Sequence, residues 1–242
     1  MAKVQRTRLF IIHHPYFMNI KDVYIVIPAK DEASKIGLVV KKVKNEGFNN
    51  IIVVNDGSED NTASIATAEG ATVISHLINL GPGAATQTGM DYAVCRGAKV
   101  VVTIDGDNQH YPSDIWKLIK AMNEEEVDVV IGSRFLENDK GIPKHRLLFN
   151  KIGNWVTALF TGLLVTDSQS GLKAMRINFV EKANLQLNGY EFCTEIISLI
   201  RKHGVSYTEV PIQVKYTQES MAKGQNFFNG VQMIGTFVRY FL

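Results

Sequence analysis

Cysteine is scarce in this sequence: two residues, Cys95 and Cys193, occur in 242. They are far apart in sequence and lie in two predicted helices, so they have neither the close spacing of zinc ligands nor the density of a disulfide-stapled secreted domain. We therefore expect two buried free thiols in a protein of a reducing compartment. No cofactor is implied by them.

The sequence also lacks a large net charge of either sign. The 26 basic and 24 acidic residues leave a formal charge of +2, and no dense run of Lys and Arg is present. A nucleic-acid partner is therefore not expected, because such partners select strongly basic stretches.

Long hydrophobic runs are absent as well. No stretch reaches the roughly 18 apolar residues of a membrane-spanning helix, and the nearest are 155–165 and 227–242. The first 17 residues lack the long apolar core of a secretory signal. We expect residues 1–21 to be a disordered extension, and the protein to be cytoplasmic and peripheral at the cytoplasmic face of a membrane.

The most informative stretch that is present is VVTIDGDNQH, residues 101–110. Residues 101–104 are apolar or β-branched and predict a buried strand that ends at Asp105 and Asp107. Gly106 allows a tight turn between the two carboxylates, and Gln109 adds an amide oxygen. Such oxygen donors suit Mg²⁺ or Mn²⁺. The alternative is an Asx-rich loop that caps the helix after Pro112.

Strands and helices alternate along residues 23–132. Strands are predicted at 23–27, 51–54, 71–75, 101–104 and 127–132. Between them we predict a turn and helix within 29–47 and helices at about 60–69, at 84–96 and after 112. This order predicts an α/β fold with a mainly parallel sheet flanked by helices. Ligands bind at the carboxyl ends of such strands, where PAKDE, NDGSED, DGDNQH and GSRF all fall.

The last third of the chain is less regular. We predict a basic loop at 136–151, an apolar helix at about 150–164, a helix at about 191–203, and strands at 206–211 and 213–216. Residues 225–242 have the spacing of an amphipathic helix with little charge. A helix docked on its own domain and a helix on a membrane surface are equally compatible with this pattern.

Seven motifs in order resemble the family-2 glycosyltransferases of the GT-A (Rossmann-like) fold, and within them the dolichol-phosphate mannose and glucose synthases. They are IPAKDEA (27–33), VVNDGSEDNT (53–62), NLGPGAATQTG (79–89), DGDNQH (105–110), VIGSRF (130–135), DSQSGLKAM (167–175) and EVPI (209–212). The resemblance implies a catalytic domain at 22–217, followed by the amphipathic helix at 218–242.

The resemblance also implies a donor site for a nucleotide-diphosphate sugar. The metal ligands would be Asp105, Asp107 and Gln109, with Mg²⁺ or Mn²⁺ stabilising the leaving diphosphate. The residues that would bind the nucleotide are Pro28, Ala29, Glu32, Asp56, Gly83 and Asp105. Gly81 and Gly83 would let the backbone approach the donor, although Pro82 stands where the family often has Lys.

On the acceptor side, Arg134, Arg146 and Asn150 match the positions that hold an acceptor phosphate, although the family commonly has Ser at the last. A phosphate attacks without a general base because it is already ionised at neutral pH. We therefore expect inverting transfer from UDP-Glc, UDP-GlcNAc or GDP-Man to dolichyl or polyprenyl phosphate, with catalytic roles for Asp107, Arg134 and Glu195.

Two alternatives stay open. The same donor chemistry with a saccharide hydroxyl as acceptor would need a general base, and Glu195 and Glu191 are the candidates. A nucleotidyltransferase or a non-catalytic nucleotide-binding module could also use such a sheet. The partners expected under the main interpretation are the sugar donor, the polyprenyl phosphate and the membrane surface.

Overall fold

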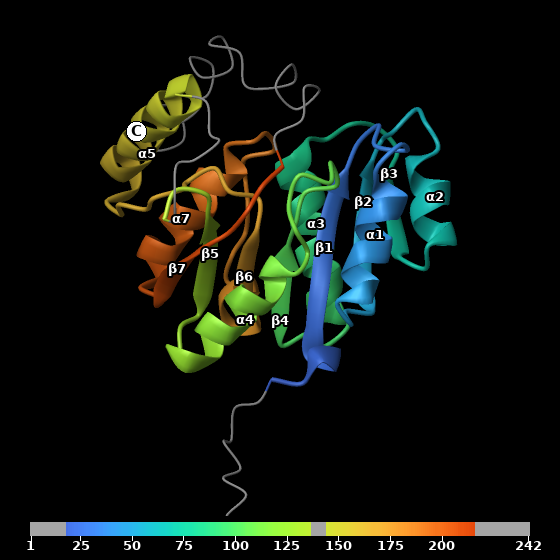
Figure 1. The fold of residues 1–242 in the computed structure, drawn as a ribbon, viewed down its shortest axis with the longest axis horizontal. Coiled ribbons are helices and arrows are strands. Elements are labelled where there is room, and N and C mark those ends of the chain that lie inside the picture. The colour runs from blue at the N-terminus through green and yellow to red at the C-terminus, as the bar shows by residue number, and fades with distance from the viewer. Residues whose placement is uncertain (1–17, 137–143, 216–242) are drawn as a thin grey trace, which may run out of the picture.

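A computed structural model describes residues 18–136 and 144–215, and only the backbone of 144–149. Its centre is a seven-stranded sheet with the order β3-β2-β1-β4-β6-β5-β7 (Figure 1). The strands are β1 (Val23–Ala29), β2 (Asn50–Asp56), β3 (Thr72–His76), β4 (Val100–Thr103), β5 (Val129–Ser133), β6 (Lys173–Arg176) and β7 (Tyr207–Pro211). The predicted α/β fold with a mainly parallel sheet is confirmed.

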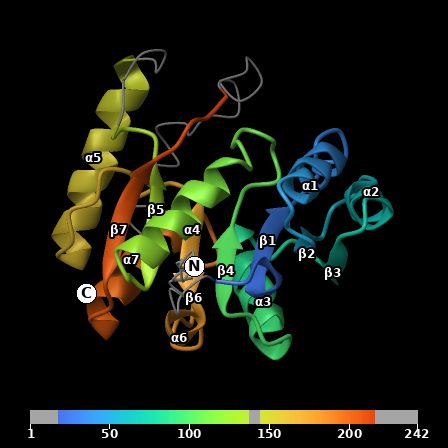
Figure 2. The same ribbon diagram turned by 60° about the horizontal axis from the view of Figure 1, so that its bottom comes forward.

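Helices cover both faces of this sheet (Figures 1 and 2). They are the short 3-10 helix η1 (Ile20–Asp22), α1 (Ile36–Asn45), α2 (Thr62–Ala68), α3 (Pro82–Cys95), α4 (Asp114–Glu124), α5 (Lys144–Thr161), α6 (Ile177–Val180) and α7 (Phe192–His203). The buried side chains of α1, α2 and α4 share one core cluster, and those of α3, α6 and α7 share the other. Helix α5 packs on α7 at one side.

Strand β6 is the one member of the sheet that the sequence did not predict. It pairs antiparallel with β4 and with β5, while the other neighbours pair in parallel. It has only four residues and begins and ends with the charged residues Lys173 and Arg176, so its sequence lacks the apolar pattern that predicts a strand. Because its direction is reversed, its first residue lies at the carboxyl edge of the other strands, and so does the preceding segment 167–172.

Three further predictions are corrected by the structure. The strand expected at 213–216 is reduced, over its described residues, to one bridge between Val214 and His110. The loop expected at 136–151 is helical from Lys144, and α5 stops before Gly162, whose φ of +70° suits a helix end. Cys193 is buried as expected, but Cys95 is exposed at the end of α3.

The ends of the predicted domain are covered only in part. Met18 and Ile20 pack against the core, so the described part of the expected extension 1–21 belongs to the domain. Residues 1–17 and the amphipathic helix expected at 218–242 lie outside the described residues. Among those that are described, no helix has both the length and the apolarity to cross a membrane.

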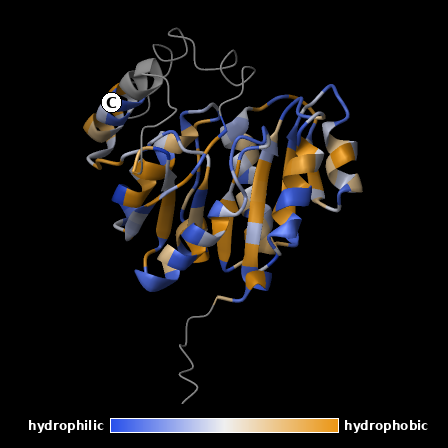
Figure 3. Ribbon diagram, in the orientation of Figure 1, coloured by the Kyte–Doolittle hydropathy of each residue, from blue (hydrophilic) through white to orange (hydrophobic). Residues whose placement is uncertain are grey.

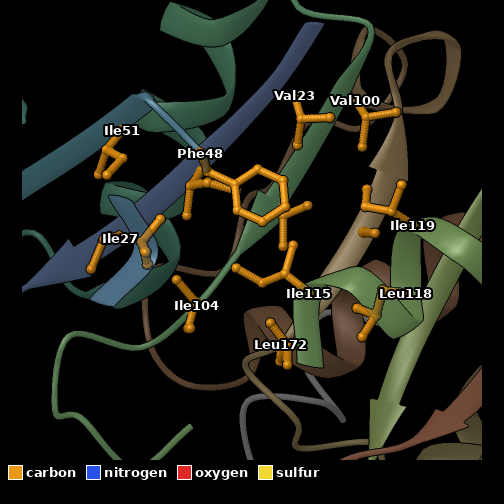
Figure 4. Close-up of a cluster of buried hydrophobic side chains, with 14 of the residues drawn as sticks. Val23, Ile27, Phe48, Ile51, Val100, Ile104, Ile115, Leu118, Ile119 and Leu172 are labelled. Atoms are coloured by element: carbon orange, nitrogen blue, oxygen red, sulfur yellow. The ribbon is translucent and has the colours of Figure 1, made fainter. Parts of the chain in front are cut away.

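The core explains why the site has a rigid base. The central strands are apolar on both faces, as Figure 3 shows by their colour, because helices bury them from both sides. Phe48, Ile104 and Ile115 lie in one cluster (Figure 4), and Ile104 is 1% exposed. Its amide donates to the carbonyl of Val26 at 3.0 Å. Asp105 therefore follows directly on a residue fixed in the core.

Candidate active site

The carboxyl edge of the sheet gathers the polar loops that the sequence singles out. The loops after β1, β2, β4 and β5 all lie at this edge, at the top of Figure 1. Segment 167–172 joins them, because β6 begins there and runs the other way. The Oγ1 of Thr103 donates to the carbonyl oxygen of Gly171 at 2.8 Å and ties this segment to the end of β4.

The loop after β4 holds two carboxylates close together. Asn108 has a φ of +62°, a left-handed conformation that Asn tolerates, and the chain turns back there. The backbone amide of Gln109 donates to Asp107 at 3.0 Å, and its side-chain amide also contacts that carboxylate. Asp105 accepts a hydrogen bond from Nε2 of His110 at 3.1 Å. The loop thus holds the two acids in place from within.

The two carboxyl groups differ in their electrostatics. Partial burial opposes ionisation of Asp105, but the hydrogen bond from His110 and the charges of Lys173 and Arg134 hold its pKa below the usual value. At Asp107, partial burial and then the negative charge of Asp105 raise the pKa. A cation between the two would relieve this repulsion.

The residues present fit a divalent metal ion. Asp105 and Asp107 supply hard oxygen donors, and the Asp105 side chain is 43% exposed, so it has an open side. The amide of Gln109 would present its oxygen to the ion after a half-turn of its end. No group of three His, Cys, Asp or Glu side chains with metal-site geometry occurs within residues 18–136 and 150–215. Solvent and substrate oxygens would therefore complete the coordination.

Asp56, expected to bind the nucleotide, is closed off by its own chain. Its Oδ1 accepts from Nδ1 of His76 and from the amide of Leu80, both at 2.8 Å. Its Oδ2 accepts from the amide of Gly81 at 2.8 Å, and the residue is 3% exposed. Nε2 of His76 in turn contacts Oγ1 of Thr88 at 3.0 Å. This geometry favours a structural role for Asp56.

An open groove of about 570 Å³ lies beside Asp56. It is lined by Lys30, Asn55, Gly57, Ser58, Glu59, His76, Leu77, Ile78 and Asn79. The loop after β1 borders it: the amide of Glu32 donates to Oγ1 of Thr62, and its side chain pairs with Lys35 at 3.5 Å. Pro28 and Ala29 end β1, and Ala29 is buried.

Gly81 and Gly83 allow a close approach, but to the protein's own backbone. An added Cβ at Gly81 would lie 2.3 Å from the carbonyl oxygen of Asn188, and one at Gly83 would lie 2.0 Å from that of Leu187. The amide of Gly83 donates to Asn188 at 2.7 Å. These contacts account for both glycines, and a contact of Gly83 with the donor stays a prediction.

Arg134 makes a bidentate ion pair with Asp167. Its Nε and Nη2 lie 2.6 and 2.7 Å from the two oxygens of a fully buried carboxylate. Glu209, from the EVPI motif, holds the same segment by accepting from the amide of Thr166 at 2.9 Å. The arginine is thereby fixed in orientation and remains 23% exposed at the edge of the site.

The other expected phosphate ligands lie on α5. Asn150 donates to the carbonyl of Thr166 at 3.4 Å, and Asn154 donates to the same oxygen at 2.6 Å. These bonds join α5 to the segment that holds Arg134. Arg146 lies in the first turns of α5, and its side chain is outside the described residues.

Glu195 is buried in α7, and its carboxylate accepts hydrogen bonds from two backbone amides. Its two oxygens accept from the amides of Gln186 at 2.8 Å and Leu187 at 2.9 Å, and it is 0% exposed. Glu191 stands at the N-terminal cap of α7. The geometry of Glu195 favours a role in holding the segment that packs on Gly81 and Gly83.

Sequence reasoning assigned no role to four residues of the site, namely His110, Asp167, Gly171 and Tyr190. His110 and Gly171 contact Asp105, and Asp167 orients Arg134. Desolvation, and then the negative charges of Asp105 and Asp107, raise the pKa of Tyr190. The motifs DGDNQH and DSQSGLKAM contain three of them, so the sequence marked their segments as part of the site. It did not indicate which side chains these residues contact.

Comparison with known proteins identifies the family. The sequence model of glycosyl transferase family 2 matches residues 24–203. The chain belongs to glycosyl transferase family 2. The resemblance to its dolichol-phosphate branch is also confirmed, since relatives named for transfer to dolichyl or polyprenyl phosphate are at least 30% identical to this chain.

Three proteins are similar in sequence to this glycosyltransferase. It is 36% identical to the UDP-N-acetylglucosamine–dolichyl-phosphate N-acetylglucosaminyltransferase of Methanococcus voltae, over 88% of this chain and 93% of that protein. It is 30% identical to the polyprenol monophosphomannose synthase of Mycolicibacterium smegmatis, over 78% and 75%. An uncharacterized protein of Methanocaldococcus jannaschii is 40% identical over 90% and 91%.

Among solved structures, the glucosyl-3-phosphoglycerate synthase of Mycobacterium tuberculosis has a TM-score of 0.69 and 19% identity, and the match covers 90% of this chain and 79% of that one. This likeness shows the fold and confirms the GT-A prediction.

Proposed function

We propose that this glycosyltransferase moves a sugar from a nucleotide-diphosphate sugar to a polyprenyl phosphate, with inversion at the anomeric carbon. The observation that carries the proposal is the pairing of an acidic loop with a fixed arginine at one edge of the sheet. Asp105 and Asp107 lie in the loop after β4, and Arg134 directly follows β5, close enough for its charge to act on Asp105. The names of two relatives support the acceptor.

The chemistry would be a single displacement. A phosphate oxygen of the acceptor attacks the anomeric carbon of the donor, a new carbon–oxygen bond forms, and the bond to the nucleoside diphosphate breaks. No base is needed, because the acceptor phosphate is already ionised. A bound divalent ion supplies charge stabilisation for the departing diphosphate. Asp105 and Asp107 would hold that ion, with Gln109 as a third ligand.

The donor nucleotide would lie along the groove beside Asp56. The groove runs at the ends of β1, β2 and β3, next to the loop that carries Pro28, Ala29 and Glu32. Its lining includes Lys30, a cation of the kind that phosphates attract, and Asn55. Asp56 would act here through the loop 79–81 that it anchors.

The acceptor phosphate would be held at Arg134, with Arg146 and Asn150 from α5. Arg134 suits this role because Asp167 locks its guanidinium plane, which saves the entropy of ordering a flexible side chain. Arg134→Lys keeps the charge and loses the bidentate pair, so we expect a higher KM for the acceptor and an unchanged KM for the donor.

Helix α5 would lie at the membrane surface that holds the acceptor. Its outward residues Ile152, Trp155 and Leu159 are 49%, 76% and 81% exposed, at helical spacing. Exposed apolar residues on one helix face, with an aromatic among them, are typical of interfacial helices. The amphipathic helix predicted at 225–242 would add a second contact with the membrane.

The test is the transfer of radiolabel into organic-extractable product. UDP-glucose, UDP-N-acetylglucosamine and GDP-mannose are offered with Mn²⁺ and a short polyprenyl phosphate. We expect label from one donor in the organic phase, and its loss with EDTA. Label that stays in the aqueous phase as a glycosylated saccharide would contradict the proposal and favour a hydroxyl acceptor.

A further inference from the structure

We infer that His110 is a positioning residue that holds the Asp105 carboxylate in the orientation that binds a divalent metal ion. The inference rests on the metal role of Asp105 and Asp107 in the proposed function. It adds a residue that neither the sequence motifs nor the names of the relatives assign.

The His110 side chain is buried and hydrogen-bonds to Asp105. It is 5% exposed, and its Nε2 lies 3.1 Å from Oδ2 of Asp105. Because a carboxylate accepts, Nε2 carries the proton and cannot also bind a metal ion. Nδ1 is buried and has no hydrogen-bond partner among the described residues. Within these residues, the contact with Asp105 is the single hydrogen bond of the ring.

The backbone around His110 is clamped from the far end of the sequence. His110 forms a bridge with Val214, and the amide of Lys215 donates to the carbonyl of Gln109 at 2.9 Å. The amide of Gln213 donates to Asp114 at 2.8 Å and fixes the same segment. A ring on such a braced loop has little freedom, so it can define where a flexible carboxylate points.

Gly171 limits Asp105 from another side. An added Cβ at Gly171 would lie 2.3 Å from Oδ2 and 2.4 Å from Oδ1 of Asp105. No real Cβ tolerates such contacts, so glycine is required for the carboxylate to stand in this place. The imidazole of His110 occupies Oδ2 of Asp105, and Gly171 leaves room for the carboxylate beside it. The carboxylate is 43% exposed, so one side of it stays open to a metal ion.

The consequence is quantitative. Groups that hydrogen-bond to metal ligands typically change metal affinity by about 10- to 100-fold when removed. Loss of the His110 donor should therefore weaken metal binding without removing any ligand. Loss of space at Gly171 should have the same effect through a different contact.

Four variants of the full chain separate these effects. His110→Leu removes the donor, and His110→Gln places an amide donor at a similar reach. Gly171→Ala displaces the carboxylate without touching the imidazole. His203→Leu is the matched control, because His203 ends α7 at the opposite edge of the sheet. Circular dichroism melting establishes that each variant is folded at the assay temperature.

The readout is the dissociation constant of Mn²⁺ in the presence of UDP, measured by electron paramagnetic resonance of free Mn²⁺. We expect His110→Leu and Gly171→Ala to raise it by about 10-fold or more, His110→Gln to restore most of the affinity, and His203→Leu to match the wild type. Equal Mn²⁺ affinity in wild type and His110→Leu would overturn the inference. So would a wild type that binds no Mn²⁺.

The outcomes distinguish this inference from the proposed function. If His110→Leu binds Mn²⁺ as tightly as a wild type that labels polyprenyl phosphate, the inference fails and the proposed function stands. If His110→Leu loses Mn²⁺ affinity and the wild type labels no polyprenyl phosphate, the inference stands and the acceptor assignment fails.

Discussion

Two strand ends of this molecule carry the same Asp-Gly pair and differ in how far the aspartate is exposed. Asp56 is the last residue of β2 and Gly57 follows it, whereas Asp105 and Gly106 lie just beyond the end of β4. Each aspartate pairs with a histidine. The Asp56 side chain is 4% exposed, whereas that of Asp105 is 43% exposed. One acid is enclosed by the protein and the other faces a place for a ligand.

The difference comes from what the chain brings to each carboxylate. At Asp56, the loop after β3 folds back and donates the amides of Leu80 and Gly81. At Asp105, the neighbouring segment presents Gly171, which has no side chain, and the loop itself adds a second acid, Asp107. A carboxylate whose two oxygens both accept hydrogen bonds from the protein stabilises the fold. Two adjacent carboxylates with oxygens left open are suited to bind a cation.

The largest effect is expected at the open loop. Asp107→Ala removes one of two carboxylates that would hold the metal ion, and transfer of label should fall by about 10³-fold because charge stabilisation of the leaving group is lost. The melting temperature should not fall, since the repulsion with Asp105 disappears. Asp91→Ala, an exposed change on α3, serves as control. Near-normal activity of the Asp107→Ala variant would contradict a catalytic role for a metal ion held by Asp105 and Asp107.

At the closed loop the same kind of change should act on stability. Asp56→Ala removes three hydrogen bonds, from His76 and the amides of Leu80 and Gly81, which should cost about 3 kcal/mol. The Gly81 amide keeps a second acceptor, Oδ1 of Asn79. For a domain of this size that loss of stability lowers the melting temperature by about 6–12 °C. Calorimetry measures it. If Asp56→Ala melts like the wild type but loses UDP binding, Asp56 is a nucleotide ligand after all.

Glu195 extends the comparison to a third acid. Glu195→Gln exchanges one accepting oxygen for a donor that faces a backbone amide, so stability should fall by about 2 kcal/mol. The kcat at a temperature where the variant is folded should change by less than about 10-fold. A general base would lose about 10²- to 10⁴-fold, which would favour a hydroxyl acceptor.

The sequence predicted the open loop better than the closed one. Alternating strands and helices predict the sheet, and the sheet places residues 105–109 and Arg134 at one edge. The closure of Asp56 depends on a loop 24 residues later, and the pair Arg134–Asp167 spans 33 residues, so neither is a local pattern. Strand β6 was missed because it has only four residues, and two of them, Lys173 and Arg176 at its ends, are charged.

The smallest effect concerns the pH dependence of stability without metal. The pKa of Asp107 is raised above its usual 3.8, so the folded state binds this proton more tightly than the unfolded state. Stability is then lost as pH rises from about 3.8 through the raised pKa. Asp107→Asn cannot ionise, so its melting temperature minus that of the wild type should grow across this window. A difference that is constant with pH would contradict the raised pKa.

The acceptor assignment is tested most directly by a matched pair of lipids. Wild-type protein, Mn²⁺ and the donor that gives label are incubated with dolichyl phosphate or with dolichol, which differ only in the phosphate. The account predicts labelled lipid with dolichyl phosphate alone, because the phosphate is both the nucleophile and the group that Arg134 would hold. Equal labelling of dolichol would contradict it, since a hydroxyl would then be the acceptor.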